Sequence, residues 1–270
     1  MRTKARWVRW AAAGLALCCG SAWAQPALAS ADHGVTVAAG VVHRRLVERA
    51  DGGQPLVRES GELLRLQVAG TQVLAGGAAL RAEVAMAAAR LAYRGQTQAG
   101  VPLATEDGHR DLALDLAWRP LVPARWGEAW LVLHALQQRR QIASTDTARG
   151  LRETSALLLP GLRWRHGFEA AGWRWAPSAE VRASLRHRLE VEFGGIFDTA
   201  DLEGGRRREF VLGLEAAPLA SPWRFGVEWT HAGQSASAAQ ALTRAGATVG
   251  TVRQPRIAID DVTLRVGRSF

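Results

Sequence analysis

Three residues of this chain have the types that proton-transfer chemistry near neutral pH requires. Asp107 and His109 stand two residues apart, and His231 lies farther along the chain. A carboxylate and a histidine within hydrogen-bond distance of each other move protons to and from reacting groups, as hydrolysis requires. Asp107, His109 and His231 are therefore the candidate catalytic residues of this sequence.

Other kinds of reactive centre are not indicated. Gly204-Gly205 lacks the lysine that a phosphate-binding loop needs, and no histidines have the spacing of a metal site. Ser184 and His187 have opposite parity on an extended chain, which argues against a Ser–His pair for lipid hydrolysis. We therefore expect no metal and no cofactor.

The elements that must position these residues are β-strands. From Trp173 to Phe193 the odd positions are almost wholly apolar, and the even positions are almost wholly charged or polar. An alternation of period 2 indicates a strand. Strands of soluble proteins usually have roughly 3–10 residues. A tilted membrane strand needs about 9–11 residues inside the lipid and can extend beyond it.

The same alternation recurs along the chain and predicts about ten strands. Their ranges are 35–47, 58–69, 78–94, 108–119, 128–142, 151–166, 172–192, 206–217, 223–233 and 257–270. Short connections at 120–127, 167–172 and 218–222 contrast with long ones at 96–107, 194–205 and 234–256. Short turns on one side and long loops on the other are typical of an antiparallel up-and-down transmembrane β-barrel. An even strand count places both termini on the periplasmic side.

Aromatic residues gather beside the expected short turns. Their amphipathic rings belong at the boundary between lipid headgroups and hydrocarbon. They predict a periplasmic aromatic girdle made of Trp118, Trp126, Trp164, Trp173, Trp175, Trp223 and Phe270.

Charged residues occupy the opposite parity, which faces the lumen. A ten-stranded barrel is narrow, since eight strands are just filled by side chains. Mixed arginines and carboxylates in such a lumen should pair with one another and plug it, although a narrow arginine-lined path for small anions is the alternative. The expected lumen charges are Arg65, Arg81, Glu83, Asp115, Glu180, Arg182, Arg186, Glu209, Glu215, Glu228, Asp261 and Arg265.

The first 24 residues have the pattern of a secretory signal peptide. A basic start is followed by an apolar run at 10–19 and the small-x-small motif Ala22-Trp23-Ala24. We expect residues 25–34 to form a short periplasmic tail and 35–270 to form the barrel domain. Both cysteines, Cys18 and Cys19, lie in the signal, so the exported part has no cysteine.

The basic charge of the chain needs a partner outside the cytoplasm. The signal contains four basic residues and no acidic one, so the net charge of +9 falls to +5 without it. Export disfavours nucleic acid as the partner, and genomic base composition that favours arginine over lysine is the alternative explanation of the charge. Outer-membrane lipid and the phosphates of lipopolysaccharide are the expected counter-charges.

The last ten residues, DVTLRVGRSF, resemble the closing strand of Gram-negative outer-membrane β-barrels. One parity is apolar and ends on an aromatic residue, namely Val262, Leu264, Val266 and Phe270. In that family the barrel-assembly machinery recognises this signal, and the strand pairs with the first one because an open edge cannot exist in lipid. The resemblance implies the cell outer membrane as location and the assembly machinery as a partner. We expect a monomer.

The strand count also resembles that of the omptins, outer-membrane proteases with acidic and histidine residues at the extracellular rim. Omptins carry an Asp pair and an Asp–His pair near the loop ends. In this chain Asp107 and His109 are expected at the second long loop, and Asp198 and Asp201 at the fourth. No Asp-x-His stands opposite them, so the omptin pattern is not matched.

Three functions follow as expectations. The first is a barrel with a narrow or charge-plugged lumen and long extracellular loops, in a structural or surface-interaction role. The second is a small-solute channel that favours anions, and the third is an omptin-like surface hydrolase. A soluble periplasmic protein remains the alternative architecture, in which a second sheet would cover the apolar face.

Overall fold

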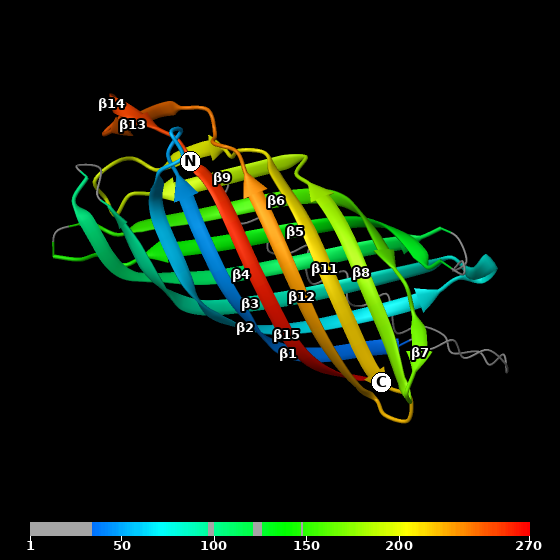
Figure 1. The fold of residues 1–270 in the computed structure, drawn as a ribbon. Helices are drawn as coiled ribbons and strands as arrows, with labels where there is room; N and C mark the ends of the chain where they lie inside the picture. Colours follow the sequence, from blue (N-terminus) through cyan, green and yellow to red (C-terminus); the bar gives the residue numbers. More distant parts are fainter. Residues whose placement is uncertain (1–33, 97–99, 121–125, 147) are drawn as a thin grey trace.

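The strands of the chain form one closed ring (Figure 1). The computed structural model describes residues 34–96, 100–120, 126–146 and 148–270. The expected signal peptide and most of the expected tail therefore lie outside the described residues. The wall consists of β1 (Gly34–Arg49), β2 (Pro55–Val73), β3 (Ala79–Gln96), β4 (Pro102–Arg119), β5 (Glu128–Ile142), β6 (Leu151–Arg165), β8 (Trp173–Ala183), β9 (Arg186–Glu192), β11 (Arg207–Pro218), β12 (Trp223–Gln234) and β15 (Arg256–Ser269).

In the described residues the wall is an antiparallel barrel of ten strands, if β8 and β9 are counted together as one interrupted strand. β8 and β9 follow each other along one position, because both pair with β6. β1 pairs with β15 from Thr36↔Ser269 to Arg49↔Arg256, and Phe270 donates its backbone N–H to Val35 at 2.9 Å. The last residues of the chain thus close the ring, and the expected all-β barrel is confirmed.

The outward face of the wall is an apolar belt that no other described element covers. Leu64, Met86 and Leu264 are 72%, 62% and 60% exposed. Within the described ranges the other sheet is the two-stranded hairpin of β13 (Gln240–Arg244) and β14 (Ala247–Val252). The two-sheet alternative is therefore excluded. No helix among the described residues has the length and hydropathy needed to cross a bilayer.

The expected aromatic residues lie at one end of this belt. Trp118 is the last residue but one of β4, Trp223 begins β12, and both rings face outward with nearly half their surface exposed. Trp164 donates its indole N–H to the carbonyl of Trp126 at 3.0 Å. Trp173 and Trp175 follow on β8, and Phe270 is 72% exposed. This is the geometry of a headgroup-level girdle.

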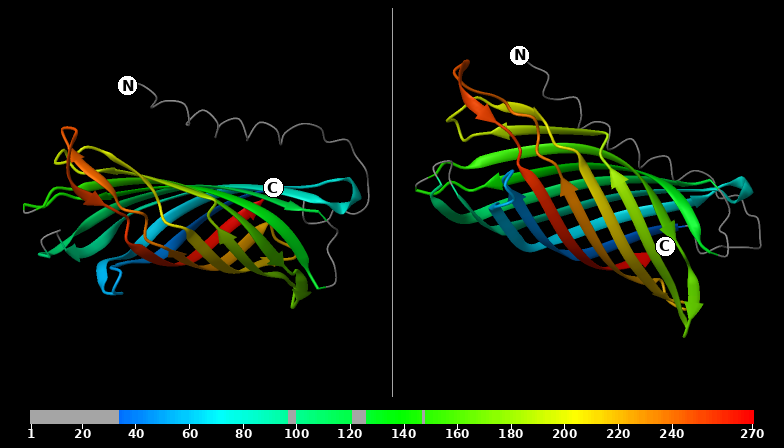
Figure 2. Two further views of the ribbon diagram at one scale, coloured as in Figure 1. Left: turned by 90° about the horizontal axis from the view of Figure 1, so that it is seen from above. Right: turned by 45° about the horizontal axis from the view of Figure 1, so that its top comes forward.

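Small elements decorate the two ends of the barrel. A 3₁₀ turn (Ala75–Gly77) and β7 (Phe168–Ala170), which pairs with β8, lie at the end of the aromatic residues. β10 (Ala200–Glu203) pairs with β9 at the other end. The β13–β14 hairpin also projects there, away from the C-terminus (Figure 2).

The strands are longer than the sequence indicated, and this corrects one expected loop. β3 and β4 pair continuously out to Gln96↔Pro102, so only residues 97–101 connect them. Asp107 and His109 consequently lie inside β4 rather than in a long loop. The strands continue into this part because they extend beyond the membrane there. Charged outward residues such as Arg94 and Glu106 then face water, and no apolar outer face is needed.

A second correction concerns the face of β9. Between Gly161↔Arg182 and Leu158↔Arg186, three residues of the β8–β9 position oppose two of β6. This extra residue is a β-bulge, which reverses the direction of every following side chain. Pro160 lies opposite it, where a strand can lack one N–H donor. Leu189 therefore points inward, although the uninterrupted alternation placed it outward.

The interior is not wholly polar, and the fifth strand, β5, therefore lacks a clear alternation of apolar and polar residues. Trp130, Val132 and Leu136 of β5 are buried inside the barrel. Trp130 and Val132 pack with Ala79 and Ala117. Apolar residues thus occupy both faces of β5, and alternation alone cannot assign them.

Candidate functional site

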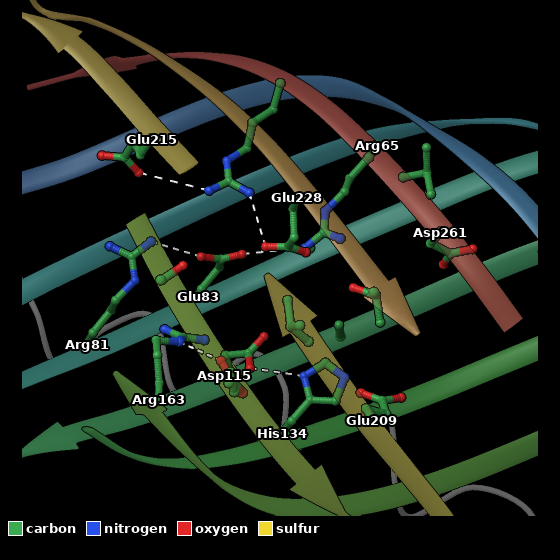
Figure 3. A pocket seen from close by; sticks show the side chains of 18 of the residues that line it. Arg65, Arg81, Glu83, Asp115, His134, Arg163, Glu209, Glu215, Glu228 and Asp261 are labelled. Atoms are coloured by element: carbon green, nitrogen blue, oxygen red, sulfur yellow. Dashed lines mark hydrogen bonds and ion pairs between the residues drawn. The ribbon is translucent and has the colours of Figure 1, made fainter. Parts of the chain in front are cut away.

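A network of ion pairs fills the middle of the barrel (Figure 3). Arg163 and Arg182 both donate to Glu180. His134 lies with Nδ1 3.0 Å from an Asp115 carboxylate oxygen. These groups come from β4, β5, β6 and β8, whose inward positions meet across the narrow lumen. Each described charge here has an opposite charge beside it, which offsets the cost of burial.

The part of the lumen at the end of the aromatic residues, which the sequence analysis places on the periplasmic side, is richer in arginine. Glu215 accepts from Arg224 at 2.8 Å and lies 3.7 Å from Arg165 and 3.9 Å from Arg265. Arg265 also lies 3.3 Å from Glu228. One carboxylate is thus shared by three guanidinium groups, and the periplasmic end of the lumen is basic.

The extracellular part contains the opposite arrangement, in which one guanidinium is shared by four carboxylates. Arg140 lies 2.8 Å from Glu48, 2.7 Å from Glu153 and 3.2 Å from Asp107, and it donates to Glu59 as well. His109 Nε2 lies 2.8 Å from Glu59 and 3.2 Å from Asp107. We call these six residues the Arg140 cluster, which consists of Arg140, His109, Glu48, Glu59, Asp107 and Glu153.

The centre of the Arg140 cluster is buried, whereas the side chains of Glu48 and Glu153 at its edge are 12% and 17% exposed. The side chains of Glu59 and Asp107 are 0% exposed and that of His109 is 2% exposed. Leu46, with Ile257 and Ile259, forms an apolar group next to it. Substrate therefore has no access to these side chains in this conformation.

The lumen contains a cavity of about 220 Å³ that ends below the cluster. Its lining runs from Thr36 and Ser269 at the periplasmic end to Arg44 and Gln138 at the other. A separate space of about 30 Å³, room for roughly one water, touches Arg140. The main cavity is lined by ten arginines and eight carboxylates, so it is a polar, slightly basic space, and none of the six residues of the Arg140 cluster lines it.

Three residues of the cluster have the donor set of a metal site. One ligand atom each from Glu59, Asp107 and His109 lies within 4.8 Å of the others. Arg140 donates to both carboxylates, however, so a guanidinium already supplies the positive charge that a cation would bring. The arrangement therefore fits an ion-pair cluster better than a metal centre.

The candidate residues from sequence separate in space. Asp107 and His109 belong to the buried Arg140 cluster. His231 lies on the outer face of β12, half exposed, and pairs with Asp260 at 2.8 Å. The wall of the barrel separates this pair from His109, so the three candidates do not form one site.

Eleven of the twelve expected lumen charges line the main cavity. Arg186 is the exception and a correction, because it follows the bulge and faces outward. Glu59 and Arg140 are the main residues that sequence reasoning missed. Glu59 shares the inward parity of Arg65, so continued alternation beyond the belt would have found it. Arg140 lies on β5, whose alternation is obscured.

Comparison with known proteins identifies no relative by sequence. No family model matches the chain. No curated protein matches it either.

Solved structures of similar architecture are outer-membrane barrels. Similarity to the outer membrane protease OmpT from Escherichia coli has 9% identity and a TM-score of 0.48, covering 90% of this chain and 99% of that one. The translocator domain of the autotransporter NalP from Neisseria meningitidis is 10% identical with a TM-score of 0.45, and the match covers 88% of each chain. The β domain of the Bordetella autotransporter BrkA is 14% identical with a TM-score of 0.43, and the match covers 88% of this chain and 100% of that one. These three structures are a protease and two autotransporter domains.

The location follows from the barrel itself. A closed wall, an uncovered apolar belt and a girdle of tryptophans at one end require a bilayer. The chain is an outer-membrane β-barrel.

Proposed function

We propose that this protein is a closed, charge-plugged barrel with a structural or surface-interaction role. The observation that carries the proposal is the blocked lumen. The main cavity ends below the Arg140 cluster, where a guanidinium ties together β1, β2, β4 and β6 from its place on β5. A solute crossing the barrel would have to break these contacts in a poorly solvated space.

The extracellular end supports the surface role. The β13–β14 hairpin is held against the 193–199 loop, because Asp198 accepts from the backbone N–H groups of Gly246 and Ala245 at 2.9 and 3.1 Å. Hairpin residues such as Val249 are exposed. An ordered and exposed hairpin is a suitable contact surface for a partner outside the cell.

A conducting state is the second candidate, favoured by the lining of the main cavity. Ten arginines against eight carboxylates would attract small anions that enter from the periplasm. This function requires the Arg140 cluster to rearrange. A rim hydrolase of omptin type has less support, because Asp107 and His109 are buried and His231 is on the outer face.

The partners of the barrel are part of the proposal. The barrel-assembly machinery would recognise β15, whose last residue, Phe270, is exposed. Lipid and lipopolysaccharide would surround the belt. The monomer is proposed because each wall strand in the described chain finds its partner within the ring.

Single-channel conductance in planar bilayers tests the proposal. The wild-type barrel should give no discrete current steps in 1 M KCl. Regular anion-selective steps from the wild type would contradict the plugged barrel and support the channel. Incubation with peptides and esters, comparing the wild type with His109→Ala, tests the hydrolase in parallel.

A further inference from the structure

The strands β3, β4 and β5 are neighbours in the wall (Figure 1). Three arginines gather on their outer face. Arg110 of β4 and Arg139 of β5 are directly opposite each other. Arg110 also opposes Ala88 of β3, and Arg90 follows two residues farther on the same face. Opposite residues in a sheet have Cβ atoms about 5 Å apart, and diagonal ones about 7–8 Å. The three guanidinium groups are therefore within reach of one small anion.

The chain itself does not neutralise this group. Arg110 and Arg139 have no hydrogen bond or ion pair with any residue in the described ranges. Arg90 is 81% exposed and lies 3.5 Å from Glu106, the one carboxylate that contacts the group in the described structure. Like charges directly opposite each other destabilise a sheet. The arrangement is thus unfavourable for the isolated protein and becomes favourable when an anion bridges the arginines.

The position of the arginines indicates where the anion comes from. On β4 the next outward residue below Arg110 is Leu112, which opens the apolar belt and is 38% exposed. Beside Leu112 on β3 lies Met86, 62% exposed. Two residues of a strand span about 7 Å, so the guanidinium groups stand directly above hydrocarbon. A charged headgroup with acyl chains beneath it fits this surface, whereas a soluble anion would leave the apolar part unused.

We propose that Arg90, Arg110 and Arg139 bind the phosphate of a phosphorylated outer-leaflet lipid, whose acyl chains lie along Met86 and Leu112. Guanidinium groups suit this task, because their fork of N–H donors matches phosphate oxygens in pairs. The site is independent of the lumen, and it rests on the proposed function only in taking lipopolysaccharide as a partner of the barrel. It assigns a defined lipid position on one side of the barrel rather than a general attraction.

The test compares the wild type with the double variant Arg110→Gln/Arg139→Gln, purified in detergent and mixed with diphosphoryl lipid A. Bound lipid is measured by phosphate analysis, and stability by the temperature of the heat-induced gel shift. The double variant should bind lipid A about 30-fold more weakly, because the loss of each surface arginine should weaken binding about fivefold. Without lipid it should be at least as stable as the wild type, because the repulsion is gone. Unchanged lipid A binding would overturn the proposal.

The matched control is Arg58→Gln/Arg94→Gln. These arginines also oppose each other across β2 and β3. Their substitution removes the same charge as the double variant does. Arg94 lies four residues beyond Arg90, away from the belt, so lipid A binding should persist. An equal loss of lipid A binding in this control would show that only the total charge matters, and it would overturn the proposed site.

Two further arms use the wild type alone, so the result does not depend on folding of a variant. Lipid A without its phosphates should not raise the gel-shift temperature, and inorganic phosphate at the same concentration should not raise it either. A full rise with dephosphorylated lipid would overturn the phosphate assignment. A full rise with inorganic phosphate would overturn the lipid assignment.

Discussion

Arg140 illustrates how single residues stabilise this barrel. It is a hydrogen-bond donor to Glu48, Glu59, Asp107 and Glu153, and it lies on a different strand from all of them. With all four carboxylates ionised and His109 protonated, the cluster holds two more negative than positive charges. Removing its guanidinium would leave four buried carboxylates without their main partner, and the penalty for unpaired buried charge is large.

Arg140→Met should therefore lower the free energy of unfolding by about 3–5 kcal/mol, as expected when one partner of a buried ion pair is removed. Urea unfolding in lipid vesicles measures the effect. Arg188→Met serves as the control, since Arg188 faces outward on β9 and has no ion pair in the described chain. Equal stability of the two variants would contradict the central role of Arg140.

Asp198 acts at the surface and predicts a pH dependence of the hairpin. The backbone N–H of Gly246, the Thr243 side chain and the N–H of Ala245 hold the pKa of Asp198 below its ordinary value of 3.8. A lowered pKa means that the contact is present above pH 3.8 and is lost as the pH falls through the lowered value. Amide exchange of Ala245 and Gly246, corrected for intrinsic rates, should thus show protection at pH 7 that disappears in strong acid.

Asp198→Asn supplies the control for this titration. The amide cannot ionise, so the variant should show weak protection without a step between neutral and acidic pH. A step of the same size in Asp198→Asn would assign the transition to another group.

At the scale of elements, the bulge between β8 and β9 separates two parts of one wall position. Below it Val181 faces lipid, and above it Arg188 faces outward while Leu189 packs inside with Val191 and Leu202. A strand whose outer face is charged cannot remain in hydrocarbon without a large cost. The bulge therefore lies where the chain leaves the membrane, and it lets apolar residues fill the interior of the projecting part.

Cysteine labelling tests the reversed face, because residues 20–270 contain no cysteine. Arg188→Cys should react rapidly with a membrane-impermeant thiol reagent on intact cells. Leu189→Cys should react many times more slowly, since Leu189 is 3% exposed. If Leu189→Cys reacted faster than Arg188→Cys, the alternation would continue unbroken through this strand and the bulge would be contradicted.

At the scale of the whole molecule, the wall projects well beyond the bilayer on one side. Belt residues such as Val262, Leu264 and Val266 lie toward the C-terminal half of β15, whereas its outward Asp260 lies above them. Strands of up to 19 residues exceed the 9–11 that the hydrocarbon needs. The extracellular part of the barrel is therefore a water-exposed extension whose rigidity depends on the Arg140 cluster.

The depth of the belt can be measured along β15. Leu264→Arg, at the centre of the belt, should cost about 2–4 kcal/mol, and Ala258→Arg, above it, about 0–1 kcal/mol. Reversible urea unfolding in vesicles gives both values. Equal costs at the two positions would show that the belt does not mark the membrane.

The sequence by itself determined the architecture, the location and most of the lining. Alternation over ten segments, tryptophans beside short turns and a terminal Phe270 required a closed barrel, because each feature acts through local geometry and contact with lipid. Parity likewise assigned charges such as Glu180 and Asp261 to the lumen. These are one-dimensional properties, since side-chain direction in a strand depends only on position.

Only the tertiary structure decided which charges meet and where the alternation fails. The Arg140 cluster draws on five strands, and its members are up to 105 residues apart between Glu48 and Glu153, so no spacing reveals it. The bulge depends on the register of β6 against β8 and β9, which a single strand cannot specify. The arginines of the outer face became a site only when the pairing of β3, β4 and β5 set them side by side. Long-range register, rather than residue type, produces these features.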